Sequence, residues 1–353
     1  MKRKSILAMM TTVLSVGTNL CHAVTYEITD LGNFGGVDAT PLSINESGHI
    51  IATYRATEYG PLRGIIWQDG TVTDLGTLGG TSTMAYGLND LGQVVGHSKT
   101  SRGSTHGFLW EEGTMTDLGA ISGDFSCAHG INNNSQITGW TNIPDPPDPR
   151  GDIRAFLWEN STMTSLGTLG GWVSYGYGIN DLGQIAGYSY ISTGQVHGFL
   201  WEHGAMTDIG SIDGTAVEIN NSGQIVGRRN GRGFLWQDGA MTDLGTLGGS
   251  SSLARSINEA GQIVGKAKIS TGEEHAFLWE NNTMVDLNML LPVNSAWNSL
   301  VIANAINNNG QIVGIGMTNE DYHAFLLTPV PEPTTLLLLG LGALALRRKR
   351  TRK

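Results

Sequence analysis

Apolar and polar residues alternate along short runs throughout the chain, and glycine-containing turns separate the runs. In one representative stretch, four such runs are rich in β-branched or aromatic residues: residues 173–180, 184–191, 197–202 and 205–209. Turn sequences with Asn, Asp and Gly lie between them, where glycine supplies positive φ and Asn or Asp caps backbone N–H groups. Apart from the two ends, no run has the length and 3.6-residue period of an amphipathic helix. The pattern therefore predicts short strands joined by tight turns.

This four-strand unit occurs seven times. One marker is an Ile-Asn segment that begins at Ile44, Leu88, Ile131, Ile179, Ile219, Ile257 and Ile306. Segments of the Phe-Leu-Trp and Asp-Leu-Gly types also occur seven times, both with variants, and the unit length is mostly about 43 residues. Four strands in about 43 residues is the content of one β-propeller blade. We therefore predict an all-β fold, a seven-bladed β-propeller.

The phase of the repeats predicts how the propeller closes. Residues 25–32 have the sequence of a fourth strand, whereas residues 324–327, at the end of the last repeat, have the sequence of a third strand. We expect the N-terminal strand to complete the seventh blade, which hides sheet edges that would otherwise template aggregation. An open β-solenoid is the alternative architecture.

The repeats resemble the HAF family of bacterial extracellular repeat proteins, named for the His-Ala-Phe present here at residues 275–277 and 323–325. The resemblance covers nearly the whole body and includes the final repeat, with its Asp-Leu-Asn-Met-Leu-Leu-Pro segment at residues 286–292. It implies an extracellular location and a repeat architecture, but it implies no particular catalytic activity or ligand. Repeats one, three and five depart from the pattern because they have no aligned His; Arg154 stands there in the third.

The N-terminus has the pattern of a secretory signal peptide. Basic residues at positions 2–4 precede an apolar stretch from Ile6 to Val16, and the small-residue site that follows predicts cleavage between Ala23 and Val24. The predicted domains are a signal peptide at residues 1–23, the propeller at residues 24–329 and a C-terminal sorting signal at residues 330–353.

The C-terminal segment begins with Val330, Pro331, Glu332 and Pro333, continues with an apolar run at residues 336–346 and ends in a basic cluster from Arg347 and Arg348. Eleven apolar residues fall short of the roughly 20 that span a bilayer core as a helix. The arrangement resembles the PEP-CTERM sorting signal of Gram-negative bacteria. The resemblance implies a short hydrophobic transmembrane helix, transient inner-membrane association and processing by an exosortase-type membrane protease. An ordinary tail anchor is the alternative.

Charge and cysteine content narrow the class of protein further. Residues 24–346 carry 12 basic and 31 acidic residues, a formal net charge of −19. Such an acidic body disfavours nucleic acid, whose binding depends on Lys and Arg contacts to phosphates. Cys21 leaves with the signal peptide, so Cys127 has no partner for an intramolecular disulfide. A secreted chain of this kind needs a full hydrophobic core.

Several repeated residue types offer candidate chemistry. Four histidines at one repeat position could form a metal ring, but neighbouring blades would hold them too far apart, so we expect a structural or solvated role: His106, His197, His275 and His323. The aspartates of the Asp-Leu-Gly segments are expected to cap turn N–H groups, with cation binding as the alternative. The tryptophans of the Phe-Leu-Trp segments are expected to pack between blades, with carbohydrate stacking as the alternative.

Two further features fall outside the repeat pattern. Trp140 and Trp172 are the candidates for an exposed ligand-binding patch. Residues 142–152 contain four prolines and three aspartates and lengthen the third repeat, which predicts an extra stiff surface loop; a partner contact or calcium site is the alternative there.

The chain contains no Gly-x-Ser-x-Gly nucleophile motif, no His-Glu-x-x-His metal-binding motif and no phosphate-binding glycine loop followed by Lys-Ser or Lys-Thr. We expect a noncatalytic binding or structural module without a cofactor, exported to the cell surface or the exopolysaccharide matrix, with extracellular polysaccharide as a possible partner. A secreted polysaccharide-active propeller enzyme, a hydrolase or lyase, is the alternative. Paired carboxylates in one deep pocket would distinguish that enzyme from a module.

Overall fold

The computed structural model describes residues 25–145, 148–214, 218–291, 295–319 and 321–330. Residues Tyr26–Pro329 form one compact unit, and the two chain ends form a second unit that lies almost wholly outside the described residues. The predicted signal peptide, including Ala23 and Val24, lies outside the described residues. So do the predicted C-terminal helix and all of the predicted sorting signal after Val330.

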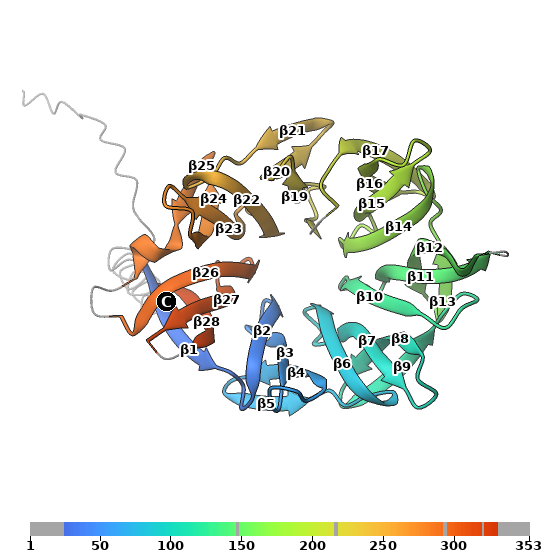
Figure 1. Ribbon diagram of the computed structural model, residues 1–353, viewed down its shortest axis with the longest axis horizontal. Coiled ribbons are helices and arrows are strands. Elements are labelled where there is room, and N and C mark those ends of the chain that lie inside the picture. The colour runs from blue at the N-terminus through green and yellow to red at the C-terminus, as the bar shows by residue number, and fades with distance from the viewer. Residues whose placement is uncertain (1–24, 146–147, 215–217, 292–294, 320, 331–353) are drawn as a thin grey trace, which may run out of the picture. The chain divides into compact units, whose positions relative to one another are not determined.

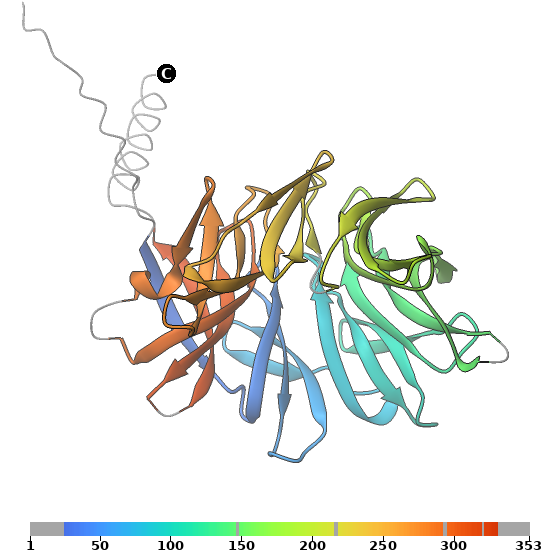
Figure 2. The ribbon, with the colours of Figure 1, turned by 45° about the horizontal axis from the view of Figure 1, so that its top comes forward.

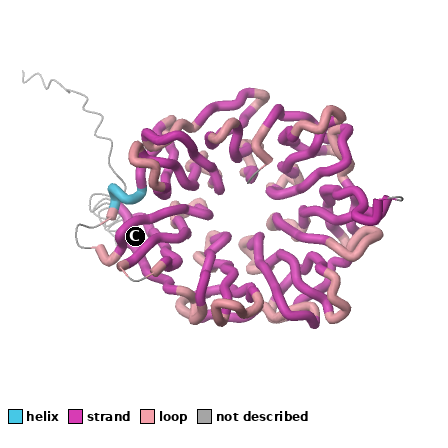
Figure 3. The backbone as a smooth tube through the Cα atoms, in the orientation of Figure 1, coloured by secondary structure: helices cyan, strands magenta, loops and turns pink. Residues whose placement is uncertain are grey.

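Nearly all regular structure in the described residues is β-strand, as Figure 3 shows. The exception is the short 3-10 helix η1 (Leu287–Leu290). We find no helix in the described part of the chain with the length and hydrophobicity of a membrane span. The chain is therefore all-β, as its alternating pattern predicts.

The strands form antiparallel four-stranded units in sequence order. The first two units are β2 (Val37–Ile44), β3 (Ile50–Arg55), β4 (Leu62–Gln68) and β5 (Thr71–Asp74), then β6 (Gly79–Leu88), β7 (Val94–Thr100), β8 (Thr105–Glu111) and β9 (Thr114–Gly119). An eight-stranded sheet holds two more: β10 (Ser126–Ile131), β11 (Ile137–Asp145), β12 (Asp148–Glu159) and β13 (Thr162–Ser165), then β14 (Gly170–Ile179), β15 (Ile185–Ile191), β16 (Val196–Glu202) and β17 (Ala205–Ser211). One parallel pairing, between Ile153 and Val173, joins these two halves.

Three more four-stranded sheets follow. They are β18 (Glu218–Ile219), β19 (Ile225–Arg229), β20 (Arg232–Gln237) and β21 (Ala240–Asp243); β22 (Gly248–Ile257), β23 (Ile263–Ile269), β24 (Glu274–Glu280) and β25 (Thr283–Asp286); and β26 (Trp297–Ile306), β27 (Ile312–Thr318), β28 (Tyr322–Val330) and β1 (Thr25–Gly32). The N-terminal strand β1 thus pairs with the C-terminal strand β28, in the place that the repeat phase predicts for it.

The sheets stand around a common centre, with the first strand of each unit innermost (Figure 1). The tilted view shows the strands of each sheet side by side, leading outward from that centre (Figure 2). Neighbouring first strands approach closely at glycines. A Cβ atom on Gly130 would lie 2.5 Å from the carbonyl oxygen of Tyr177, and one on Gly87 would lie 2.7 Å from that of His129. Only glycine fits there without a shift of the backbone.

The core is a series of apolar clusters between adjacent sheets. The phenylalanine of each Phe-Leu-Trp segment is fully buried, as Phe108, Phe156, Phe199, Phe234, Phe277 and Phe325. Of the six tryptophans in these segments, Trp110 and Trp279 are buried, whereas the others are half-buried and pack against the clusters from the side. Phenylalanine, more than tryptophan, therefore fills the space between sheets.

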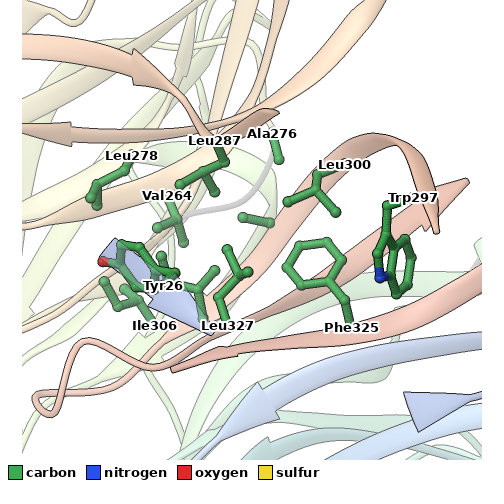
Figure 4. Close-up of a cluster of buried hydrophobic side chains, with 12 residues drawn as sticks. Tyr26, Val264, Ala276, Leu278, Leu287, Trp297, Leu300, Ile306, Phe325 and Leu327 are labelled. Atoms are coloured by element: carbon green, nitrogen blue, oxygen red, sulfur yellow. The ribbon is translucent and has the colours of Figure 1, made fainter. Parts of the chain in front are cut away.

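The first and last strands share one of these clusters. Tyr26 of β1 packs with Leu327 of β28 and with Val264 and Leu278 from the preceding sheet (Figure 4). Burial raises the pKa of the Tyr26 hydroxyl to about 12. Residues from both ends of the described chain are therefore part of one apolar core.

One expected loop is instead part of the sheet. Strands β11 and β12 extend through most of residues 142–152, and Asp145 pairs with Asp148 across the hairpin. The prediction of a loop was wrong because it relied on the prolines, which are tolerated at strand edges where their missing N–H is not needed by a neighbour.

Candidate functional site around the central cavity

Seven asparagines connect the first turns of neighbouring units. The side-chain amide of each donates a hydrogen bond of 2.8 to 3.1 Å to the backbone carbonyl of the next, and the last donates to the first. In order they are Asn45, Asn89, Asn132, Asn180, Asn220, Asn258 and Asn307. All seven are buried. We call this closed series of hydrogen bonds the asparagine cycle.

Each asparagine also shapes its own turn. Asn180, for example, accepts hydrogen bonds from the N–H groups of Leu182 and Gln184, and its amide donates to the side-chain oxygen of Gln184. The asparagine that begins the turn is therefore fully used in hydrogen bonds, as a buried polar side chain requires.

A second closed series lies one residue further along. The backbone N–H of each member donates to a side-chain oxygen of the next at 2.8 to 3.0 Å. Its members are Glu46, Asp90, Asn133, Asp181, Asn221, Glu259 and Asn308. Four of these seven side chains are carboxylates. Together with the asparagine cycle they form the polar mouth of a cavity of about 250 Å³.

A second cavity, also about 250 Å³, has a different lining, and we call it the wide mouth. The two cavities share a layer of mostly aliphatic residues: Ile44, Leu88, Ile131, Ile179, Ile219 and Ile306, with Ser43 and Glu218. The two cavities therefore meet at this layer, in the centre between the first strands.

Three rings form an aromatic arc on the wide mouth. The ring centroids of Tyr86 and His129 lie 4.6 Å apart, and those of His129 and Tyr177 lie 4.7 Å apart. Burial lowers the pKa of His129 to about 4 and raises the pKa of Tyr86 and of Tyr177. All three rings are consequently uncharged at neutral pH, and all three line the wide mouth.

Two charged groups complete the wide mouth. Glu218 accepts a hydrogen bond from the Ile257 N–H, and burial raises the pKa of its carboxyl to about 7. Arg255 occupies the repeat position of Tyr86 and Tyr177. Its side chain is exposed to solvent. The surrounding protein still removes part of the water from its guanidinium, which lowers the pKa of Arg255.

The aromatic arc continues outward to Trp140, one of the two tryptophans that the sequence singled out. Tyr177 stacks near Tyr188, Tyr188 near Tyr175, and the ring of Trp140 meets that of Tyr175 edge-on at 5.8 Å. Trp172 is 53% exposed, and its ring lies 5.3 Å from that of Tyr190. Trp140 is half-buried. Only Trp172 has the strong exposure that was expected of both.

The four repeated histidines bind aspartates and do not converge. In each case Nδ1 lies within 2.7 to 3.0 Å of a carboxylate oxygen, in the pairs His106–Asp117, His197–Asp208, His275–Asp286 and His323–Asp30. Arginine takes the histidine position in the other three repeats: Arg63 lies 3.9 Å from Asp74, Arg232 lies 3.3 Å from Asp243, and Arg154 pairs with Asp152. Within the described ranges no three His, Cys, Asp or Glu side chains are grouped in a way that could hold a metal ion.

The aspartates of these pairs also cap their turns. The Asp117 carboxylate accepts a hydrogen bond of 2.7 Å from the Gly119 N–H, and the same contact occurs at Asp30, Asp74, Asp208 and Asp243. These aspartates therefore have the capping role predicted for them, together with the histidine contact that sequence reasoning missed. Their spacing of 11 residues from the histidine or arginine was the available signal.

The free thiol is buried beside the aromatic arc. Cys127 Sγ lies 3.4 Å from His97 Nδ1 and 3.6 Å from His129 Nε2, and burial raises its pKa. A thiol kept protonated in this way is a poor nucleophile.

A family model for the PEP-CTERM protein-sorting motif matches residues 329–352. This motif indicates secretion and cell-surface sorting in Gram-negative bacteria, and such signals are processed by exosortase, a membrane protein. The resemblance of the C-terminal segment to this signal is thereby confirmed, whereas the resemblance of the repeats to the HAF family stays a prediction. No curated protein matches the chain.

Solved structures are similar to the chain in fold. A puromycin-hydrolysing peptidase from Mycobacterium tuberculosis matches with a TM-score of 0.54 at 11% identity, over 85% of this chain and 53% of that one. TolB from Acinetobacter baumannii has a TM-score of 0.44 at 12% identity, over 62% of this chain and 52% of that one, and YCF48 bound to D1 peptide has a TM-score of 0.49 at 12% identity, over 87% and 97%. The chain thus spans about half the length of the first two. The comparisons show an all-β, propeller-like fold that ends in an exosortase sorting motif.

Proposed function

We propose that the chain is an exported, noncatalytic binding or structural module, built as a seven-bladed β-propeller that its N-terminal strand closes. Closure is supported by the asparagine cycle, which returns from Asn307 to Asn45 after seven members. It is further supported by the sheet that contains both β1 and β28. A closed propeller leaves only short, protected sheet edges, which suits a protein that works outside the cell without disulfides.

The sorting motif is the observation that carries the proposed location. It overlaps β28 only at the last two residues of the strand, so removal of the tail beyond Val330 would leave every described strand in place. The chain would pass through an inner-membrane intermediate held by the C-terminal segment. Exosortase would then release it to the cell surface or the extracellular polysaccharide.

The lining of the wide mouth argues against a glycoside hydrolase. Glycoside hydrolases generally use two carboxyl groups on either side of the bond that they cleave. Among the described residues that line the wide mouth, Glu218 is the one carboxyl. The acidic side chains of the polar mouth accept hydrogen bonds from backbone N–H groups of their neighbours.

The proposal is tested in a Gram-negative host with and without an active exosortase. We expect surface-accessible protein that has lost both ends in the first strain, and membrane-retained protein with an intact C-terminus in the second; intact-mass measurement reads both ends. Cytosolic protein with both ends intact contradicts the location. Reducing-end assays on a panel of polysaccharides should show no turnover, and turnover would identify the enzyme instead. An elongated particle in small-angle scattering contradicts the closed propeller.

A further inference from the structure

The wide mouth has two chemically different sides. The aromatic arc of Tyr86, His129 and Tyr177 comes from β6, β10 and β14. Arg255 comes from β22, which Figure 1 places across the centre from β6. All four residues line the same cavity of about 250 Å³. Stacking faces and a cation therefore border one space.

Arg255 is available to bind a ligand. It makes no hydrogen bond or ion pair with any residue in the part of the chain that the structure describes, whereas Arg228 and Lys266 nearby lie 3.5 and 2.7 Å from carboxylates of Asp213 and Glu274. Its guanidinium is also partly desolvated, which strengthens the interaction with an anion because less water competes.

Positive charge continues from Arg255 along the same side. Arg255 is also part of the wall of an adjoining pocket of about 170 Å³, together with Arg228, Lys266 and Lys268, and with Glu274 as the one acid. This concentration of cations is unusual in a body whose formal net charge is −19. An anionic ligand is attracted here and repelled by the four carboxylates of the polar mouth.

We propose that the wide mouth binds a carboxylated sugar, a uronate residue of an extracellular polysaccharide, with its ring on the aromatic arc and its carboxylate on Arg255. Arginine matches a carboxylate with two parallel hydrogen bonds, and aromatic rings supply apolar faces at low entropic cost. The cavity is slightly smaller than the roughly 300 Å³ at which drug-sized ligand pockets begin, a size that suits a single sugar residue and leaves the rest of the polymer outside. This inference rests on the proposed function, because it names the ligand class of a noncatalytic module.

Single-stranded nucleic acid is the competing ligand, because it also combines stacking bases with negative charge. The uronate is favoured because one carboxylate needs only the single cation of Arg255, whereas single-stranded nucleic acid needs a positively charged groove that follows its phosphates over several nucleotides. The difference between these ligands is one arm of the test.

The experiment measures binding of a galacturonate oligomer to the full chain by titration calorimetry. The comparison ligands are a neutral glucan oligomer of equal length and an oligothymidylate. We expect the galacturonate to bind at least tenfold more tightly than either one. The variant Arg255→Gln should weaken galacturonate binding about tenfold, ~1.4 kcal/mol. Tyr177→Leu should weaken binding of both glycans, because it removes a stacking face.

Arg232→Gln is the matched control, since it removes the same charge from an exposed arginine that pairs with Asp243 away from the cavity. It should leave affinity unchanged. Urea unfolding of each variant shows whether its fold is intact, and Arg255→Lys, which keeps the charge and loses the paired hydrogen bonds, should bind with intermediate affinity.

Equal affinity of the parent chain and Arg255→Gln would overturn the inference, and so would tighter binding of oligothymidylate. Surface-exposed protein that binds no galacturonate would also overturn it while leaving the proposed function in place. Cytosolic protein, or hydrolysis of the oligomer during the titration, would instead contradict the proposed function.

Discussion

Removing one member of the asparagine cycle tests whether these hydrogen bonds stabilise the fold. In Asn180→Ala the buried side chain loses four contacts: two donated bonds, to the Asn220 carbonyl at 3.0 Å and to Gln184 Oε1 at 2.7 Å, and two accepted from the N–H groups of Leu182 and Gln184. The Asn220 carbonyl is buried but keeps a hydrogen bond of 3.0 Å from the Gly223 N–H, and the Leu182 N–H belongs to an exposed residue that water can reach.

The expected cost follows from which groups are left without a partner. A buried group that loses its partner costs about 1–3 kcal/mol, and a group that water can reach costs much less. The groups left without a partner are the half-buried Gln184 Oε1 and Gln184 N–H, since the Asn220 carbonyl keeps the Gly223 N–H. They predict a loss of about 1–3 kcal/mol in the free energy of unfolding. Urea denaturation followed by tryptophan fluorescence measures it as a lower midpoint at an unchanged slope.

Asn319→Ala is the control, because Asn319 is exposed and makes no hydrogen bond to any residue that the structure describes. The free energy of unfolding of this control should change by no more than about 0.5 kcal/mol, which is usual for surface positions. If Asn180→Ala were as stable as this control, the asparagine cycle would be a by-product of the turns, and the argument for closure from its hydrogen bonds would fail.

Three more predictions concern single groups. His275→Ala should destabilise the protein by about 1 kcal/mol through loss of the Asp286 contact, whereas EDTA should leave the melting temperature unchanged; a fall with EDTA would contradict the structural role of the histidines. The carboxyl of Glu218 has a pKa of about 7 in the folded state against an ordinary 4.5, so between these pH values the folded state binds more protons than the unfolded state. The free energy of unfolding should therefore fall by roughly 1–3 kcal/mol as pH rises from about 4.5 to 7. Glu218→Gln should remove that slope in pH-dependent urea titrations, and an unchanged slope would refute the assignment. Cys127 should react with a thiol reagent only after unfolding, and rapid labelling of the native protein would show that its environment is more open than the structure has it.

The repeat pattern predicted the strands well because each turn depends on local chemistry. In the fourth repeat, for example, the expected run at 205–209 corresponds to β17 at Ala205–Ser211, and Asp208 caps its turn as predicted. Hydrophobic alternation and glycine position determine such elements within a few residues, so one sequence contains the necessary information.

Contacts between repeats were not predictable in the same way. The asparagine of each turn was recognised as a turn residue, but its amide bonds a carbonyl 38 to 49 residues away, or 262 at closure, and no local pattern indicates that partner. The aromatic arc was missed for a related reason. Tyr86, His129 and Tyr177 come from three repeats and form one surface only after the sheets are placed around their centre.

The tryptophans show a further limit of sequence reasoning. Their lack of a repeat counterpart singled out Trp140 and Trp172 together, yet one lies half-buried against Tyr175 and the other is exposed beside Tyr190. Exposure depends on the neighbouring strand, which the sequence does not specify by itself.

The asparagine cycle has a consequence for how such a chain can evolve. Every link runs in the same direction, from a side-chain amide to the backbone of the following unit, so each unit brings one donor and one acceptor. Duplication or deletion of a whole repeat would therefore leave no donor or acceptor without a partner, provided that the angle between units still allows the series to return to its start. The number of repeats is then limited by geometry, and the lineage is free to vary the residues on the wide mouth while the turn that joins one repeat to the next stays the same.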